Sequence, residues 1–161
     1  MREIKFRGKH MRMLPQNNKL DGTWVYGYLE DKNYIYSPEL EGELLVKPET
    51  VGQYTGLKDK NGVEIYEGDI IEFLGHKGVI QYECGSFGIV FREGIDWEEI
   101  ADNICPVTGC DNALYACEND NYISLWEIYW NFNCEDGSLD TVEVIGNIYE
   151  NPELLKGGEQ E

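Results

Sequence analysis

The sequence lacks any long apolar run. No stretch approaches the roughly 20 consecutive apolar residues that a membrane-spanning helix needs, so we do not expect a membrane protein. The opening residues 1–7 contain no apolar segment of the kind that secretory signals carry. We therefore expect a chain that stays in the cytoplasm.

The residue patterns of common enzymes are also missing. There are 2 histidines, His10 and His76, and His76 lies in a glycine-flanked segment typical of a hairpin turn. The chain has no phosphate-binding glycine loop, no zinc-protease motif and no nucleophile elbow. With 31 acidic side chains, no carboxylate pair stands out as an acid/base couple. We expect a protein that is not an enzyme and needs no cofactor.

Positive charge is scarce beyond the first third of the chain. Residues 1–60 carry 10 basic and 9 acidic side chains, whereas residues 61–161 carry 3 and 22, a net charge of −19. This acidic part repels nucleic-acid phosphates and anionic membranes, so direct nucleic-acid binding is not expected. Three interpretations stay open for the acidic surface: solubility alone, docking of a basic protein, or imitation of a nucleic-acid backbone.

The five cysteines form no recognisable motif. An odd number without a secretory signal favours reduced thiols in a cytosolic protein. The last four could in principle supply the four ligands of a zinc ion, but they are separated by four, six and sixteen residues: Cys105, Cys110, Cys117 and Cys134. Ligand pairs in zinc sites are usually separated by about two to four residues. Free thiols are the favoured interpretation, and zinc is the alternative.

Apolar patterning predicts a mainly β protein. Alternating, β-branched and aromatic runs predict strands at residues 4–7, 23–29, 34–36, 44–46, 64–66, 69–73, 78–82, 87–91, 122–130 and 141–149. Such short strands, punctuated by glycines, predict a small SH3-like barrel or a strand meander with additional strands and short helices. The pair Asn61-Gly62 predicts a type I′ turn. Short helices are expected at residues 97–102 and 151–155.

Two segments are candidate contact surfaces, the loop at residues 54–60 and the aromatic strand at residues 126–130. Residues 54–62 are polar and contain two lysines, which indicates either a partner-binding loop or a solvated connection. Residues 122–130 are rich in aromatics, and because a strand alternates its faces, either Tyr129 or Trp130 must point away from the core of a single sheet. The predicted partner-binding side chains are Tyr54, Lys58, Lys60, Trp126, Tyr129 and Trp130.

Four blocks of sequence resemble the YopX family of phage and prophage proteins. They are residues 1–7, residues 51–62 continuing through 64–70, residues 84–87, and residues 144–155. The blocks come in the order of the family, whereas residues 93–140 match no family motif. We therefore expect a single domain over residues 1–161, with residues 93–120 as an irregular acidic insertion that contains cysteines.

The resemblance implies a mainly β protein in the cytoplasm of a bacterial host, and it transfers no catalytic residues. Our first hypothesis is a phage or prophage accessory protein that is not an enzyme. It would associate with itself and bind a host or phage protein. The alternative hypothesis comes from the acidic charge: a nucleic-acid mimic that inhibits a host DNA-processing or defence enzyme.

Overall fold

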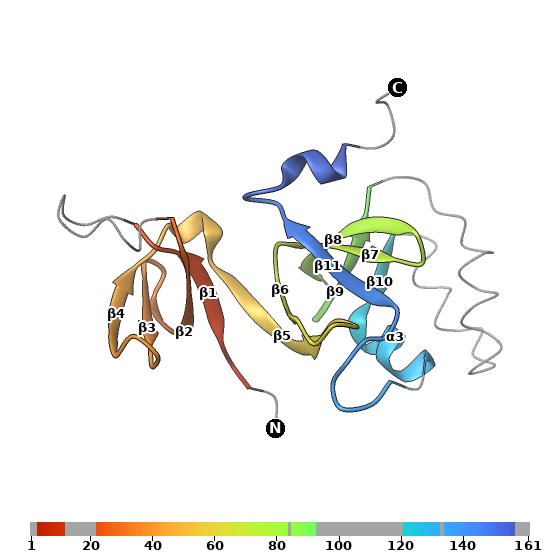
Figure 1. Ribbon diagram of the computed structural model, residues 1–161, viewed down its shortest axis with the longest axis horizontal. Helices are drawn as coiled ribbons and strands as arrows, with labels where there is room; N and C mark the ends of the chain where they lie inside the picture. The colour runs from red at the N-terminus through yellow and green to blue at the C-terminus, as the bar shows by residue number, and fades with distance from the viewer. Residues whose placement is uncertain (1–2, 12–21, 84, 93–120, 133, 157–161) are drawn as a thin grey trace. The chain divides into compact units, whose positions relative to one another are not determined.

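The computed structural model of the protein describes residues 3–11, 22–83, 85–92, 121–132 and 134–156 (Figure 1). The chain divides into two compact units, Met1–Gly56 and Leu57–Glu161. The predicted insertion, the predicted helix at 97–102 and four of the five cysteines lie outside the described residues. Each unit is described separately below.

The first unit is an antiparallel sheet of short strands. Its elements are β1 (Phe6–Lys9), β2 (Trp24–Asp31), β3 (Tyr34–Ser37), β4 (Gly42–Leu45), the 3-10 helix η1 (Pro48–Thr50) and β5 (Gly52–Lys58), whose last residues extend into the second unit. Within this unit the strand order is β4-β3-β2-β1-β5. The strands predicted at 23–29, 34–36 and 44–46 correspond to β2, β3 and β4.

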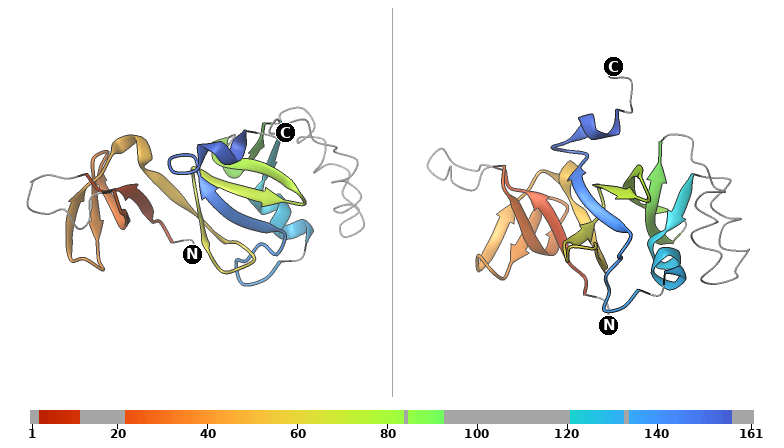
Figure 2. Two further views of the ribbon diagram at one scale, coloured as in Figure 1. Left: turned by 45° about the horizontal axis from the view of Figure 1, so that its top comes forward. Right: turned by 45° about the vertical axis from the view of Figure 1, so that its right-hand side comes forward.

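The strands of the first unit enclose a small apolar core. Its centre is Val25, Ile35 and Val46, all buried. The sheet curls, so that Met11 N donates to Leu45 O and Lys47 N donates to Lys9 O, both at 2.8 Å. Figure 2 shows this curvature in the strands β1 to β4. The apolar side chains of the curled sheet therefore gather on its inner face.

The second unit contains the predicted meander. Its elements are β6 (Glu64–Tyr66), β7 (Asp69–Phe73), β8 (His76–Glu83), β9 (Ser86–Phe91), β10 (Tyr122–Ser124), α3 (Leu125–Asn131), β11 (Val142–Asn147) and the 3-10 helix η2 (Pro152–Leu155). The sheet order is β10-β9-β8-β7-β11, antiparallel throughout. The mainly β prediction and the meander are confirmed, and the described residues form two antiparallel sheets without a closed barrel.

One apolar cluster holds the second unit together. It combines side chains of the meander with two from α3, Leu125 and Ile128, and with Leu139 and Val142 before and at the start of β11. All four of these side chains are fully buried. In the part of the chain that the structure describes, no helix has the length and apolarity to cross a membrane.

The strand predicted at residues 122–130 is wrong in its second half. β10 ends at Ser124, whose hydroxyl accepts a hydrogen bond from Trp126 N at 3.3 Å and caps α3. Leu125 and Ile128 are three residues apart, a spacing that places both on one face of a helix. The aromatic residues of the segment favour a strand locally, but burial of this face selects the helix.

Two turns also differ from the prediction. Of the pair Asn61-Gly62 only Gly62 has a positive φ, 80°, so this is not a type I′ turn. A two-residue turn with both φ angles positive lies instead at Leu74 (49°) and Gly75 (85°). It joins Phe73 to His76, and β8 therefore begins at His76 and not at Gly78. The helical turn predicted at 151–155 is confirmed as η2.

We expect Gly27→Ala to destabilise the protein. A Cβ atom at position 27 of β2 would collide with the backbone carbonyl of Tyr36 on β3, which cannot rotate away as a side chain can. The expected loss in the free energy of unfolding is about 1–3 kcal/mol, measured by urea denaturation followed by circular dichroism. Gly42→Ala is the control, because its Cβ would meet nothing closer than Leu40 O at 4.0 Å. Equal stability of the two variants would contradict the strand packing.

Candidate functional site

Residues 54–62 form a strand and a tight turn. The prediction of a polar loop is wrong here, because β5 continues through Lys58 and buries Tyr54, Thr55 and Leu57. Lys58 and the turn residues 60–63 are exposed. Only this short tip, and not the whole segment, is open to solvent.

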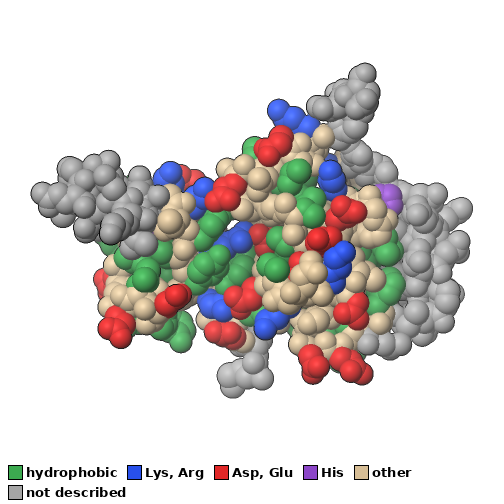
Figure 3. Space-filling view, in the orientation of Figure 1, with side chains coloured by type: hydrophobic (Ala, Val, Ile, Leu, Met, Phe, Trp, Pro, Cys, Tyr) green, Lys and Arg blue, Asp and Glu red, His purple; other side chains and the backbone are tan. Residues whose placement is uncertain are grey.

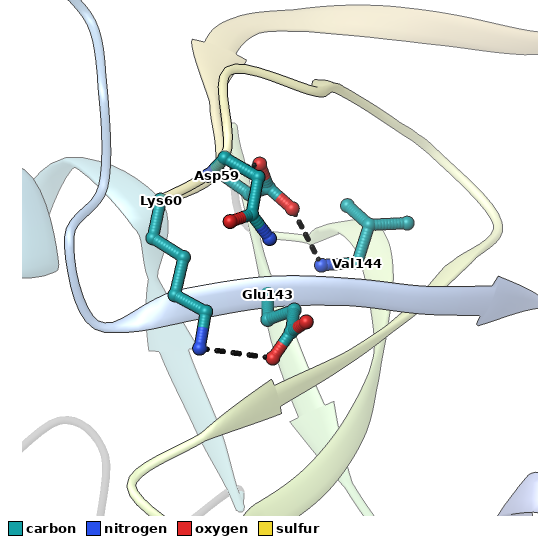
Figure 4. Close-up of polar contacts among 5 residues, drawn as sticks. Asp59, Lys60, Glu143 and Val144 are labelled. Atoms are coloured by element: carbon teal, nitrogen blue, oxygen red, sulfur yellow. Dashed lines mark hydrogen bonds and ion pairs between the residues drawn. The ribbon is translucent and has the colours of Figure 1, made fainter.

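The turn is organised around the buried carboxylate of Asp59, which is 0% exposed. Oδ1 accepts hydrogen bonds from Asn61 N at 2.8 Å and from Val63 N at 2.9 Å. Oδ2 accepts from Val144 N at 2.9 Å, so the same side chain reaches across to β11 (Figure 4). The carboxylate ties the turn after β5 to a strand 85 residues further along the chain.

The two lysines of this segment take part in the same attachment. Lys60 N donates to Val142 O at 2.9 Å, and Lys60 Nζ lies 3.0 Å from Glu143 Oε2 (Figure 4). The hydrogen bond and charge of Glu143 raise the pKa of Lys60 above its ordinary value. Lys58 N donates to Gly137 O at 2.8 Å. The backbone of both lysines therefore helps to hold the region around β11.

A second buried carboxylate closes the turn between β6 and β7. Asp69 is 1% exposed, and its Oδ2 accepts a hydrogen bond from Tyr66 N at 2.8 Å. Gly68 in the same turn has a φ of 93° and lies against the ring of Tyr149. Its carbonyl accepts from Ile148 N at 2.9 Å. This turn therefore anchors the segment that follows β11.

The segment after β11 is fixed by two asparagines. Asn147 Oδ1 accepts hydrogen bonds from Tyr149 N at 3.0 Å and from Glu150 N at 2.9 Å. Asn151 Oδ1 in turn accepts from Asn147 N at 3.3 Å. These side chains satisfy the backbone where the chain turns from β11 into η2, which is a structural role.

The predicted aromatic residues of the second unit come together on α3. The ring centroids of Trp126 and Tyr129 are 5.6 Å apart and those of Tyr129 and Trp130 are 5.4 Å apart, both in edge-to-face arrangements. Trp130 is 67% exposed and Trp126 is 36% exposed. The prediction that an aromatic side chain points outward here holds for Trp130, although a helix and not a strand presents it. We call these three residues the α3 aromatic cluster.

Of the described histidines and cysteines, His10 and Cys134 are buried. His10 is buried, and its Nδ1–H donates to Leu45 O at 2.9 Å. Burial raises the pKa of the Cys134 thiol, which keeps it protonated at neutral pH. The structure describes no group of three or more potential metal ligands among its placed residues. Because Cys105, Cys110 and Cys117 lie outside the described residues, the zinc alternative stays a prediction.

One surface was not predicted. One face of the first unit's sheet carries basic and aromatic side chains together, and we call it the basic aromatic face. Its members are Lys5, Arg7, Lys9, Trp24, Tyr26, Tyr28, Tyr36 and Tyr54. Arg7 and Tyr54 are buried, and Lys5 Nζ lies 3.8 Å from Glu3 Oε2. The signal in the sequence is the alternation of basic residues at positions 5, 7 and 9 and of aromatic residues at positions 24, 26 and 28.

Comparison with known proteins gives a family match over nearly the whole chain. The family model described as YopX protein matches residues 5–156, which include parts of both units. No curated protein matches the chain. Among solved structures, the crystal structure of protein EF1440 from Enterococcus faecalis is 24% identical, with a TM-score of 0.35, over 95% of this chain and 98% of that chain.

We expect Asp59→Asn to destabilise the second unit. An amide cannot accept all three backbone hydrogen bonds, and its NH₂ group would face a backbone N–H donor in the interior. The free energy of unfolding should fall by about 1–3 kcal/mol in urea denaturation. Glu143→Gln is the matched control, because it removes only the exposed ion pair with Lys60 and should leave stability nearly unchanged. An Asp59→Asn protein no less stable than the control would refute the assigned role of Asp59.

Proposed function

This chain belongs to the YopX family, and we propose that it is a self-associating, protein-binding module that is not an enzyme. We further propose that it is a phage or prophage accessory protein and acts in the cytoplasm of a bacterial host. Its partners would be a second copy of itself and a host or phage protein. The observation that carries the proposal is the α3 aromatic cluster, with Trp130 67% exposed.

The α3 aromatic cluster has the chemistry of an interaction surface. Tryptophan and tyrosine are enriched at the centres of protein interfaces, because they bury a large apolar area with few rotatable bonds. Tyr129 lies between Trp126 and Trp130 and holds both rings in fixed edge-to-face contact. A preformed cluster of this kind loses little conformational entropy when a partner covers it.

Charge favours α3 as the place where two copies meet. The second unit carries 5 basic and 23 acidic side chains, so most of its surface repels a second copy. Within Leu125–Asn131 the only charged residue is Glu127. A symmetric dimer places the same patch of each copy against the other, and an aromatic, nearly uncharged patch can pair with itself in this way.

The use of the buried carboxylates supports a role without catalysis. Asp59 and Asp69 are the buried acids among the described residues, and both accept backbone hydrogen bonds that close turns. A general acid or base must instead be able to reach a substrate. Their environments are those of structural groups.

We expect Trp130→Ala to weaken self-association. Light scattering of the full chain should give a mass above the 18.5 kDa of one copy, and the variant should shift toward 18.5 kDa with a dissociation constant raised about tenfold or more. Tyr82→Ala is the control, since Tyr82 is 55% exposed on β8 and lies outside the α3 aromatic cluster. A monomeric native chain, or equal effects of the two substitutions, would contradict the proposal.

The second candidate function is imitation of a nucleic acid. It is favoured by the division of charge, since the first unit carries 8 basic and 8 acidic side chains and the second carries 5 and 23. On the side of the second unit visible in Figure 3, uncharged and basic surface lies between the carboxylates. They do not form the row of negative charges that a nucleic-acid mimic needs, so we place this candidate second.

A mimic would bind a DNA-processing host enzyme in competition with DNA. That binding should weaken as salt rises from about 0.05 to 0.5 M, because it depends on exposed charge. It should be unaffected by Trp130→Ala. Binding that persists at high salt, or that DNA does not compete, would refute the mimic.

A further inference from the structure

We propose that the first unit binds an arginine-containing, basic segment of a partner protein on its strands β2, β3 and β4. The site is a row of three side chains in direct strand pairing, Tyr28, Tyr36 and Glu43, which we call the tyrosine–glutamate row. Arginine side chains of the partner would stack on the two rings and pair with the carboxylate. The proposal rests on the protein-binding function proposed above, and it adds a second surface on a different unit from the α3 aromatic cluster.

Strand pairing places the three side chains of the row on one side of the sheet. Tyr28 of β2 lies opposite Tyr36 of β3, and Tyr36 lies opposite Glu43 of β4. Directly paired residues of antiparallel strands project to the same side, with Cβ atoms about 4.5–5.5 Å apart. The row therefore crosses three neighbouring strands, with Tyr36 between Tyr28 and Glu43.

All three side chains of the row are open to solvent. Tyr28 is 57% exposed and Tyr36 is 36% exposed, and Glu43 is exposed as well. The apolar core lies on the other side of these strands, where Ile35, the neighbour of Tyr36 on β3, is buried. The row therefore offers ring surface and negative charge to a partner while the side chains of the core stay buried.

At the β1 end of the same face, cations of the chain itself lie over aromatic rings. The guanidinium carbon of Arg7 is 4.5 Å from the centroid of the Trp24 ring, and Lys9 Nζ is 5.5 Å from the same centroid. Such contacts are attractive because the face of an aromatic ring carries partial negative charge. Among the described residues no cation lies over Tyr28 or Tyr36 in this way. These two rings can therefore receive a cation that a partner supplies.

The charge around the row favours a basic partner. Residues 28–45 carry one basic side chain, Lys32, and five acidic ones. The acidic side chains are all exposed, and each belongs to the row or lies within three residues of it along the chain: Glu30, Asp31, Glu39, Glu41 and Glu43. The cations of the face lie at its β1 end, where Arg7 is buried and Lys5 Nζ is 3.8 Å from Glu3 Oε2. A basic segment that approaches the row therefore meets net negative charge.

A basic segment fits the row better than an apolar or an acidic one. An apolar partner would remove the charge of Glu43 from water without supplying a counter-charge, which is costly. An acidic partner or a nucleic acid would be repelled by the carboxylates around the row. Arginine suits both parts of the row, because its planar guanidinium stacks on aromatic rings and binds a carboxylate through two parallel N–H groups.

The test is an NMR titration of the full chain with a synthetic peptide in which arginine alternates with glycine. Salt at about 0.15 M screens charges more than about 8 Å apart and so limits general attraction by the acidic second unit. The backbone amides of Tyr28, Tyr36 and Glu43 should shift as peptide is added, whereas those of Tyr82 and Glu83 on β8 should not. A peptide with citrulline in place of arginine keeps the shape without the charge, and it should cause no shifts.

The contribution of the rings is tested at Tyr28. Tyr28→Ala should raise the dissociation constant of the arginine peptide about two- to fivefold, because one ring of the row is removed. Tyr82→Ala is the matched control, since Tyr82 is 55% exposed against 57% for Tyr28 and lies on β8 of the second unit. This control should bind the peptide as the native chain does.

The contribution of the carboxylate is tested at Glu43. Glu43→Gln should also raise the dissociation constant about two- to fivefold, because the partner loses an ion pair. Glu83→Gln is the matched control, since it removes the same charge from an exposed residue of β8 and should leave peptide binding unchanged. Equal losses in the two glutamine variants would show attraction by net charge alone and would overturn the proposal.

Three further results would overturn the proposal: no peptide binding by the native chain, equal losses in Tyr28→Ala and Tyr82→Ala, or equal binding of the citrulline peptide. It would also be overturned by amide shifts at the row when the protein is concentrated without peptide, which would assign the row to a second copy. Light scattering of the same samples separates this proposal from self-association through α3. Loss of peptide binding at an unchanged mass refutes the row alone, whereas a monomeric native chain that still binds the peptide refutes the α3 interface alone.

Discussion

The second unit depends on one buried charge. The carboxylate of Asp59 is removed from water, and an unpaired charge in that position would be strongly destabilising. Three backbone N–H groups solvate it, from Asn61, Val63 and Val144. Two of these donors belong to its own turn and the third to β11, so the charge is satisfied only when β11 is in place. Closure of the turn and attachment of the last strand are therefore one event.

Polar residues in the sequence blocks that resemble the family serve mainly this architecture. Asp59, Asp69 and Asn147 each accept backbone hydrogen bonds at a point where the chain reverses, and each lies in a block that carries the family resemblance. Side chains committed in this way hold turns and strands in register and are not free to meet a substrate. Trp126 and Trp130 of the α3 aromatic cluster are instead exposed and lie outside the apolar core of the second unit.

Much of the fold could be predicted because strand alternation is local. The meander β7 to β9 and the strands β2, β3 and β11 follow from apolar and β-branched residues read over a few positions. The segment 122–130 could not be assigned from composition, because its aromatic residues favour a strand whereas the cap at Ser124 and the burial of Leu125 and Ile128 favour a helix. The aromatic residues and the serine can both be seen in the sequence. Which of them decides the structure depends on what the segment packs against.

The candidate sites were predictable to different degrees. An outward aromatic near position 130 could be predicted, since aromatics crowded together cannot all face one core. The buried state of Asp59 could not, because its third donor is 85 residues away and no local pattern indicates it. The basic aromatic face needed strand pairing, since only the register shows that the alternating residues of β1 and β2 share a side.

Native-state hydrogen exchange tests the central claim most directly. Asn61 and Val63 are exposed turn residues, and their amides would exchange quickly in an open turn. If the Asp59 carboxylate holds turn and strand as one unit, both amides will exchange as slowly as that of Val144, and all three will lose protection together in Asp59→Asn. Fast exchange at Asn61 and Val63 beside a protected Val144 in the native chain would contradict the account.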